Sequence, residues 1–462
     1  MRMSKNLRRL LVGCTLLLAI LFAAFLWLRP LLNIGAGYAA KHACSCHFLQ
    51  GRALEDIRTL DLNFSVLGWV KLKAKENEVH SSFFGLVPRR AVYRQGVGCT
   101  LINDEAQPLV AVEDLGTFDK LSGTGAAGAA QGPRAVVNPP AALRAAFETT
   151  MAPQPGGGTR GIVVLHNGQL IAEAYAPGFG PETPQLGWSM TKTLTAMALG
   201  TALVSPTSPA AAPQKTVAQN HLFPETWTDS ARQQITLADL LHMNSGLAWN
   251  EAYGSLSDAT IMLHEHANMA RYAYDVPAVS PRNTAWNYSS GTTNILAELI
   301  DRETPGLTTH AFMHQLFHQV APSLLIEPSQ AGLPVGSSYG WATARDWANL
   351  GQFMLQDGVW QGDTLLPPGW INWMRQPAAG SGGIYGGQLW LPGPDMPDLP
   401  RDAYMMRGFQ DQRVFVIPSD GLVIARLAHE NDQVMNFALM VEQIRDGVRN
   451  ISPKQGTPAV DN

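Results

Sequence analysis

A run of apolar residues from Leu10 to Leu28 limits what the start of this chain can fold into more than any other feature. As a helix it spans roughly 28 Å, close to the roughly 30 Å hydrocarbon core of a bilayer. Inside lipid, a single segment satisfies all of its backbone polar groups only as a helix, so the run predicts a transmembrane helix within residues 1–30. The residues before it include Arg2, Lys5, Arg8 and Arg9, which predict a cytoplasmic N-terminus.

The apolar run is long for a removable signal peptide, and no Ala-x-Ala cleavage site follows it at the usual distance. We therefore expect an uncleaved signal anchor that crosses the inner membrane once. The rest of the chain would then be exported to the periplasm or the extracellular space. Small residues between Gly35 and Ala40 leave cleavage at that point as an alternative.

The rest of the composition is that of a large globular protein. The 462 residues are 46% hydrophobic and 15% charged, which is enough to bury a sizeable core, and the net charge of -4 argues against a nucleic acid partner. Gly and Ala dominate residues 122–130, as is typical of a flexible linker. The expected order is a small N-terminal region over 31–120, a linker over 121–139, the main domain over 140–450 and a disordered tail over 451–462.

The cysteines are consistent with export to an oxidising compartment. Cys14 lies in the apolar run, which leaves Cys44, Cys46 and Cys99 to form one disulfide. We expect Cys99 to pair with Cys44 or Cys46, and the alternative is three buried thiols. A metal site at Cys44, Cys46 and His47 is disfavoured because no second ligand pair follows downstream.

The chemically most informative motif is Ser189-x-x-Lys192. Residues three apart are neighbours across one helical turn, so the Lys192 amine can reach the Ser189 hydroxyl and accept its proton if burial lowers the pKa of the amine. The spacing alone is weak, because a chain of this length contains about one or two such pairs by chance. It is strengthened by two upstream strands, Gly161–Leu165 and Gln169–Tyr175, joined by an Asn-Gly turn. The start of a helix at Ser189 would also favour developing negative charge.

Three later stretches extend the pattern. Residues 239–247 predict a helix that closes at a glycine, residues 287–291 predict a loop that opens a second helix, and residues 406–412 precede a predicted strand over 413–418. In this order the motifs resemble the serine β-lactamase and penicillin-binding protein superfamily over about residues 140–445. The resemblance is greatest to the class C β-lactamase-like branch, which includes D-amino-acid peptidases, esterases and 6-aminohexanoate-dimer hydrolases.

The resemblance implies an α/β (α+β) fold in which helices pack an antiparallel sheet, joined to a mostly helical lobe over about residues 195–335. The site would lie between the two. Ser189 would be the acylated nucleophile, Lys192 the activating amine and Tyr288 a proton relay to the leaving group. Neither a cofactor nor a metal is expected, and His242, His264 and His266 lack the spacing of a zinc site.

Two departures from the family pattern bear on the substrate. Ser290 stands where many members carry an amide that grips the substrate, and Met406-Arg407-Gly408 replaces the usual Lys-Thr-Gly. Gly408 would still let a substrate lie close to the backbone, and the Phe409 N–H would complete an oxyanion hole with that of Ser189. Arg407 is the nearest cation for a substrate carboxylate.

The missing lysine argues against a dedicated β-lactamase and favours a serine hydrolase of small amides or esters. Two alternatives stay open: a non-catalytic or slowly deacylating sensor of cell-wall peptides, and a membrane-tethered structural protein. Glu251, near the expected site, is interpreted as a solvated loop carboxylate. The sequence assigns neither the natural substrate nor the oligomeric state.

Overall fold

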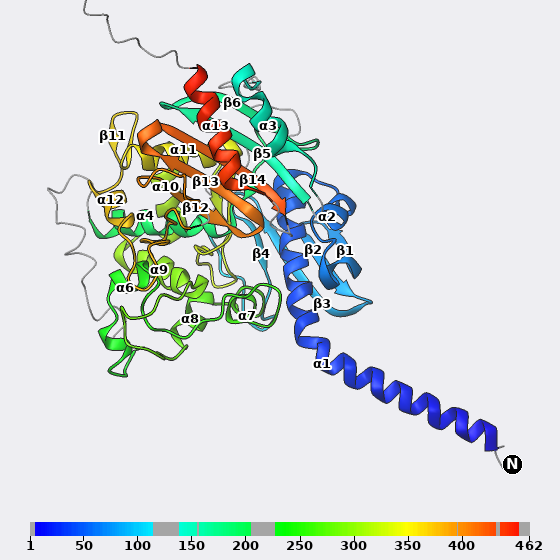
Figure 1. The fold of residues 1–462 in the computed structure, drawn as a ribbon. Helices are drawn as coiled ribbons and strands as arrows, with labels where there is room; N and C mark the ends of the chain where they lie inside the picture. Colours follow the sequence, from blue (N-terminus) through cyan, green and yellow to red (C-terminus); the bar gives the residue numbers. More distant parts are fainter. Residues whose placement is uncertain are drawn as a thin grey trace, which may run out of the picture.

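A five-stranded antiparallel sheet lies in the upper part of the molecule in Figure 1, above the helices α6 (Leu237–Leu241), α8 (Met269–Tyr274) and α9 (Ser290–Glu303). The computed structural model describes residues 5–113, 138–154, 157–204, 227–394, 396–430 and 435–451, so most of the predicted linker and tail lie outside the described residues. The strand order is β12-β13-β14-β5-β6. The strands are β5 (Gly157–His166), β6 (Gln169–Tyr175), β12 (Tyr404–Gly408), β13 (Gln412–Ile417) and β14 (Leu422–Glu430).

The predicted Asn-Gly hairpin is confirmed between β5 and β6. His166 pairs with Gln169, and the two residues between them have φ of 50° at Asn167 and 76° at Gly168. Two consecutive left-handed residues are what a tight hairpin turn needs, and Asn and Gly adopt that conformation most readily. The predicted strand over 413–418 is also confirmed, as β13.

Helices cover both faces of this sheet. On one face, α3 (Arg144–Met151) and α13 (Phe437–Ile451) pack against Ile162, Val164 and Ile424. On the other, α4 (Thr191–Leu203) and α11 (Ala344–Leu355) share a core with the neighbouring strand residues, such as Val163, Val423 and Ala425. Successive strand residues therefore face opposite layers, and both layers are apolar because the sheet is buried on its two sides.

The predicted helical lobe is present in the described part of residues 195–335. Its helices are α6 (Leu237–Leu241), α7 (Asp258–Glu265), α8 (Met269–Tyr274), α9 (Ser290–Glu303) and α10 (Thr309–Phe317). The helix predicted over 239–247 is shorter and earlier than expected. It begins after Thr236, whose hydroxyl and Asp239 form a reciprocal cap, and Gly246, with φ of 81°, lies in a turn beyond its end.

Short elements connect the lobe to the sheet. A three-stranded sheet, in the order β7-β9-β8, consists of β7 (Gln185–Leu186), β8 (Leu325–Ile326) and β9 (Gly340–Ala342). Near α11 lie the paired strands β10 (Val359–Trp360) and β11 (Asp363–Thr364), followed by α12 (Trp370–Met374). The β7 strand leads directly into the turn that carries Ser189.

The N-terminal region is built on one 46-residue helix, α1 (Lys5–Gln50), which continues well past the predicted apolar segment. Pro30 lies inside it, and Figure 1 shows the first half projecting from the molecule and the second half packed within it. The projecting residues include Leu18, 66% exposed, and Trp27, 79% exposed. Among the described residues, this is the one helix long and apolar enough to cross a membrane.

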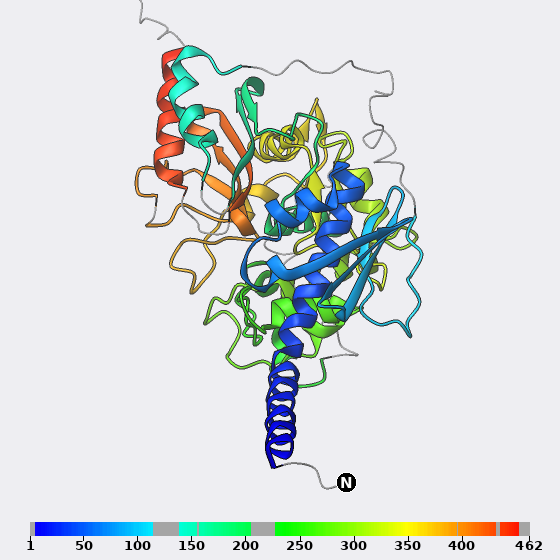
Figure 2. The ribbon, with the colours of Figure 1, turned by 90° about the vertical axis from the view of Figure 1, so that its right-hand side faces the viewer.

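The inner half of α1 packs on a second antiparallel sheet (Figure 2). Its strands, in order, are β1 (Val70–Lys75), β2 (Glu78–Phe83), β3 (Leu86–Arg94) and β4 (Gly98–Leu101), and α2 (Leu54–Leu60) lies before them. A disulfide joins Cys44 of α1 to Cys99 of β4, which confirms the expected pairing and leaves Cys46 as a buried free thiol. The same apolar core continues into the main domain, where it includes Trp188 and Trp341.

Candidate active site

Ser189 lies in a one-turn 3-10 helix, Trp188–Met190, immediately before α4. The chain reaches it through Gly187, where an added Cβ would lie 2.2 Å from the Trp347 ring, so only glycine fits without a shift. Trp188 has a φ of 48°, a left-handed conformation that a bulky side chain rarely adopts and that the surrounding packing must hold in place. The predicted nucleophile therefore follows a sharp, tightly packed turn.

Lys192, one helical turn later, lies beside Ser189 as the sequence predicts. Its Nζ donates to Ser189 Oγ at 3.0 Å, to Ser290 Oγ at 2.9 Å and to the Ser337 carbonyl at 3.0 Å. The side chain is 1% exposed, and burial lowers the pKa of the amine to about 8, while the Glu251 charge opposes the shift. An amine with this pKa is partly neutral near pH 7 and can accept a proton from serine.

Tyr288 closes the group from the other side. Its ring centre lies 4.9 Å from Lys192 Nζ. Burial and the Glu251 charge raise the pKa of Tyr288, whereas the nearby Ser189 side chain and the charge of Arg407 lower it. The structure thus brings Ser189, Lys192 and Tyr288 together.

Ser290, which the sequence placed among the substrate-binding candidates, and Glu251 are bonded to each other beside Lys192. Ser290 is fully buried at the start of α9, and its hydroxyl accepts from Lys192 and donates to Glu251. The interpretation of Glu251 as a solvated loop residue is wrong. Its carboxylate accepts from the Trp249 indole, the Tyr253 hydroxyl at 2.9 Å and the Ser290 backbone N–H at 2.8 Å. Ser290 and Glu251 are 39 positions apart, which explains why no local pattern revealed the pair.

The end of β12 lies directly against the serine turn. A Cβ on Gly408 would meet the Gly187 carbonyl oxygen at 2.1 Å, so the absence of a side chain lets the serine turn itself pack against this glycine. The approach of a substrate to Gly408 stays a prediction. Phe409 follows, with its ring stacked on Tyr253 at 5.0 Å and edge-on to Trp188 at 5.6 Å.

Arg407 and three aromatic rings lie beside Tyr288. The Arg407 guanidinium carbon lies 4.5 Å from the Trp390 ring centre, which in turn lies 5.4 Å from that of Tyr288. The rings of Trp286 and Tyr385 pack on these two. A cation held over an aromatic surface can contact both a substrate carboxylate and an apolar chain.

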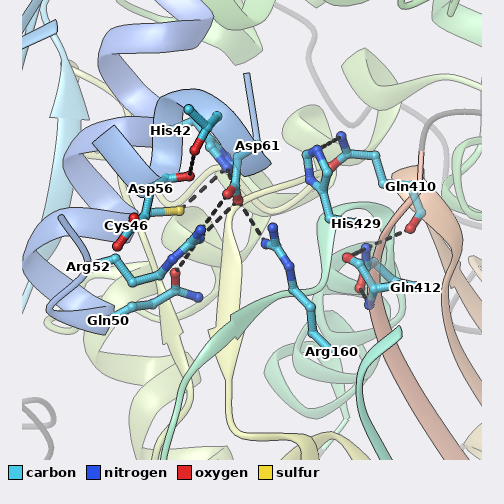
Figure 3. A network of polar contacts seen from close by, with 12 residues as sticks. His42, Cys46, Gln50, Arg52, Asp56, Asp61, Arg160, Gln410, Gln412 and His429 are labelled. Carbon is cyan, nitrogen blue, oxygen red and sulfur yellow. Dashed lines mark hydrogen bonds and ion pairs between the residues drawn. The ribbon is translucent and has the colours of Figure 1, made fainter. Parts of the chain in front are cut away.

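A second polar cluster is shown in Figure 3, and Gln410 links it to the serine turn through the Trp188 indole. His42, Asp61 and His429 are the one group of three close metal-ligating side chains in the part of the chain that the structure describes. Their chemistry does not fit a metal ion, because Arg52 and Arg160 donate to Asp61 at 2.6 Å and 2.8 Å and already neutralise it. Burial disfavours the charged form of His42, but Cys46 and Asp61 outweigh it and raise the pKa to about 9.

The fold and this geometry agree with the comparisons to known proteins. The family model described as Beta-lactamase matches residues 143–449, which is most of the chain. The chain belongs to the β-lactamase family. This membership places it among serine hydrolases, and the match begins and ends close to the limits of the predicted main domain.

Two kinds of relative support the assignment of this β-lactamase-family protein. A 6-aminohexanoate-dimer hydrolase of Paenarthrobacter ureafaciens is 23% identical over 234 residues, covering 46% of this chain and 56% of the relative. The chain therefore matches little more than half the length of that curated relative. Among solved structures, EstA of Arthrobacter nitroguajacolicus Rue61a has a TM-score of 0.52 at 18% identity, covering 69% of this chain and 99% of EstA. At this identity the likeness shows a shared fold.

Proposed function

We propose that this protein is a membrane-anchored serine hydrolase that cleaves small amides or esters through an acyl-enzyme on Ser189. The observation that carries the proposal is the buried Lys192 amine, 3.0 Å from Ser189 Oγ, with its pKa lowered to about 8. A lysine in this state is a base suited to activating a serine. The 6-aminohexanoate-dimer hydrolase among the relatives supports a small amide as substrate.

The acylation step follows from the positions of three side chains. Neutral Lys192 takes the Ser189 proton while Oγ forms a bond to the substrate carbonyl carbon, and the carbonyl π electrons move to oxygen. The Ser189 and Phe409 N–H groups would hold this oxyanion. When the carbon–nitrogen or carbon–oxygen bond then breaks, the leaving group takes a proton from Tyr288, which Lys192 replaces.

Deacylation reverses the same proton path. A water molecule gives its proton to the Tyr288–Lys192 pair as its oxygen bonds to the acyl carbon, and Ser189 leaves with the returned proton. The carboxylic acid is released. Arg407 beside Trp390 is suited to a substrate that carries a carboxylate on a short apolar chain, so we assign acyl-group or leaving-group recognition to this pair.

The buried half of α1 supports an uncleaved anchor. Residues 35–40, where small side chains offered a cleavage alternative, lie inside the helix, and Ala36, Ala39 and Ala40 are fully buried. Cleavage there would remove part of the folded core. We therefore propose that the protein stays in the inner membrane by one helix, with the catalytic domain on the exported side.

Intact mass spectrometry of the full-length protein tests the function. The protein is treated with a fluorophosphonate, a p-nitrophenyl ester and a penicillin, beside Ser189→Ala. We expect a covalent adduct that Ser189→Ala abolishes, with ester adducts that disappear within seconds to minutes as the product is released. An adduct that persists for hours with every acyl donor would favour the sensor, and a folded wild type without any adduct would exclude the acyl-enzyme.

A further inference from the structure

The anchor helix α1 packs directly behind the turn that carries the nucleophile. The rings of Tyr38 in α1 and Trp188 are parallel within 2°, with centres 6.0 Å apart, and His42, one turn along α1, is also parallel to Trp188 at 6.4 Å. These separations are those of offset aromatic stacking. Trp188 is 4% exposed and directly precedes Ser189 in a left-handed conformation, so the packing around its ring also acts on the serine backbone.

Trp188 also reaches the other half of the proposed oxyanion hole. Its indole Nε1–H donates to Gln410 Oε1 at 3.3 Å, and the Gln410 amide in turn contacts His429 Nε2 at 3.2 Å. Burial keeps His429 neutral by lowering its pKa well below the usual range, so this nitrogen can accept the amide N–H. Gln410 follows Phe409 and has a left-handed φ of 58°. The residue before Ser189, Trp188, is therefore bonded through its indole to the residue after Phe409, Gln410. This bond joins the two segments that carry the Ser189 and Phe409 N–H groups.

The inner half of α1 is held firmly against the main domain. Lys41 forms a buried ion pair with Glu327, and His42 bonds to Asp61 at 3.2 Å. Asp61 also binds Arg160 of β5 at 2.8 Å, as Figure 3 shows. Because ionic contacts and the Cys44–Cys99 disulfide fix this half, Tyr38 presents a rigid surface to Trp188.

We propose that Tyr38 is a positioning residue, through which the membrane-anchor helix sets the geometry of the oxyanion hole. The inference rests on the proposed hydrolase function. Left-handed non-glycine residues are strained and persist only where packing holds them. Without the Tyr38 ring, Trp188 relaxes towards α1, and the Ser189 N–H moves away from the position of the developing oxyanion. A misplacement of about 1 Å can lower a rate about 100-fold.

Three full-length variants in detergent or nanodiscs separate positioning from stability. Tyr38→Leu removes the stacked ring. Tyr38→Phe keeps it and loses a hydroxyl that is buried without a hydrogen-bond partner among the described residues. Phe48→Leu is the matched control, because Phe48 is on the same helix and stacks at 4.7 Å on Tyr93 of β3, away from the serine turn. Each is measured for fluorophosphonate labelling rate, ester kcat and KM, the pH profile and thermal unfolding.

We expect Tyr38→Leu to lose about 10- to 100-fold in labelling rate and kcat, with KM and the pH profile unchanged because Lys192 is untouched. Tyr38→Phe and Phe48→Leu keep kcat within about twofold, although Phe48→Leu lowers the unfolding temperature. A folded Tyr38→Leu enzyme with wild-type kcat, or an equal loss in Phe48→Leu, overturns the positioning role.

If Tyr38→Leu does not fold, Trp188→Phe decides, because it keeps the stacked ring and removes the bond to Gln410. A loss of about 3- to 10-fold in kcat supports the coupling, and unchanged kcat refutes it. A folded wild type without any Ser189-dependent adduct contradicts the hydrolase function itself, whereas a reactive wild type with an equally reactive Tyr38→Leu contradicts the positioning role alone.

Discussion

Lys41 and Lys192 are both buried beside an aromatic ring, yet their surroundings suit them to different tasks. Lys41 Nζ lies 4.2 Å from the Tyr339 ring centre and pairs directly with the Glu327 carboxylate. Lys192 Nζ lies 4.9 Å from the Tyr288 ring centre and donates to two hydroxyls and a carbonyl. Burial lowers the pKa of both amines, and in each case a glutamate opposes the shift.

The two lysines differ in how close this glutamate lies to the amine. Glu327 contacts Lys41 directly, and its carboxylate also accepts from the Trp341 indole at 2.7 Å and from the Cys99 N–H. This ion pair is therefore held in place at the junction of α1 and the main domain. Glu251 is separated from Lys192 by the Ser290 hydroxyl. A carboxylate in contact retains the proton on an amine, whereas a carboxylate one hydroxyl away leaves the amine free to release it.

Replacing each lysine by methionine gives the largest contrast. Lys192→Met removes the proposed base, and we expect acylation by an activated ester to fall about 1,000-fold or more with little change in unfolding temperature. Lys41→Met should leave acylation of the folded protein within about tenfold of wild type. Stopped-flow acylation rates on both variants check this. Comparable losses would contradict the assignment of proton transfer to Lys192 and of an ion pair with a purely structural role to Lys41.

Local chemistry explains which parts of this contrast the sequence could predict. Ser189 and Lys192 are linked by helix periodicity, Tyr288 by its place in the motif order, and the β5–β6 hairpin by its Asn-Gly turn. Glu251 and Glu327 act through contacts with residues 39 and 286 positions away, for which one sequence offers no signal. The predicted helix ended near Pro30, because proline usually ends a helix. In the structure α1 continues for 20 more residues, which pack on the small sheet.

The second largest effect concerns stability. Lys41→Met leaves Glu327 buried without its cation, and we expect it to lower the free energy of unfolding by about 3–5 kcal/mol. Adding Glu327→Leu should restore much of the loss, since no unpaired charge remains. Urea denaturation monitored by tryptophan fluorescence measures both. If Lys41→Met alone is as stable as wild type, the Lys41–Glu327 pair does not hold α1 to the main domain.

The disulfide tests the same junction by covalent means. Cys44 and Cys99 are 55 residues apart, so Cys44→Ser frees a long loop in the unfolded chain and should lower the free energy of unfolding by about 2–4 kcal/mol. Cys46→Ser, which leaves the disulfide intact, should cost less. The pairing itself is checked by alkylation in non-reducing denaturant, where Cys14 and Cys46 react and the other two do not. Labelling of Cys44 would contradict the bond.

The smallest expected change is the most specific to Lys192. The negative charge of Glu251 favours the charged amine, so Glu251→Gln should lower the pKa of Lys192 further below about 8. Since the neutral amine is the active form, the acid limb of the profile of kcat/KM against pH should move to lower pH, by up to about one unit. Glu148→Gln, an exposed change of the same charge on α3, controls for net charge and should leave the limb in place. A limb that does not move would mean that the Ser290 hydroxyl insulates the amine from Glu251 and that burial alone sets the pKa of Lys192, and a limb that moves to higher pH would contradict the assigned effect of Glu251.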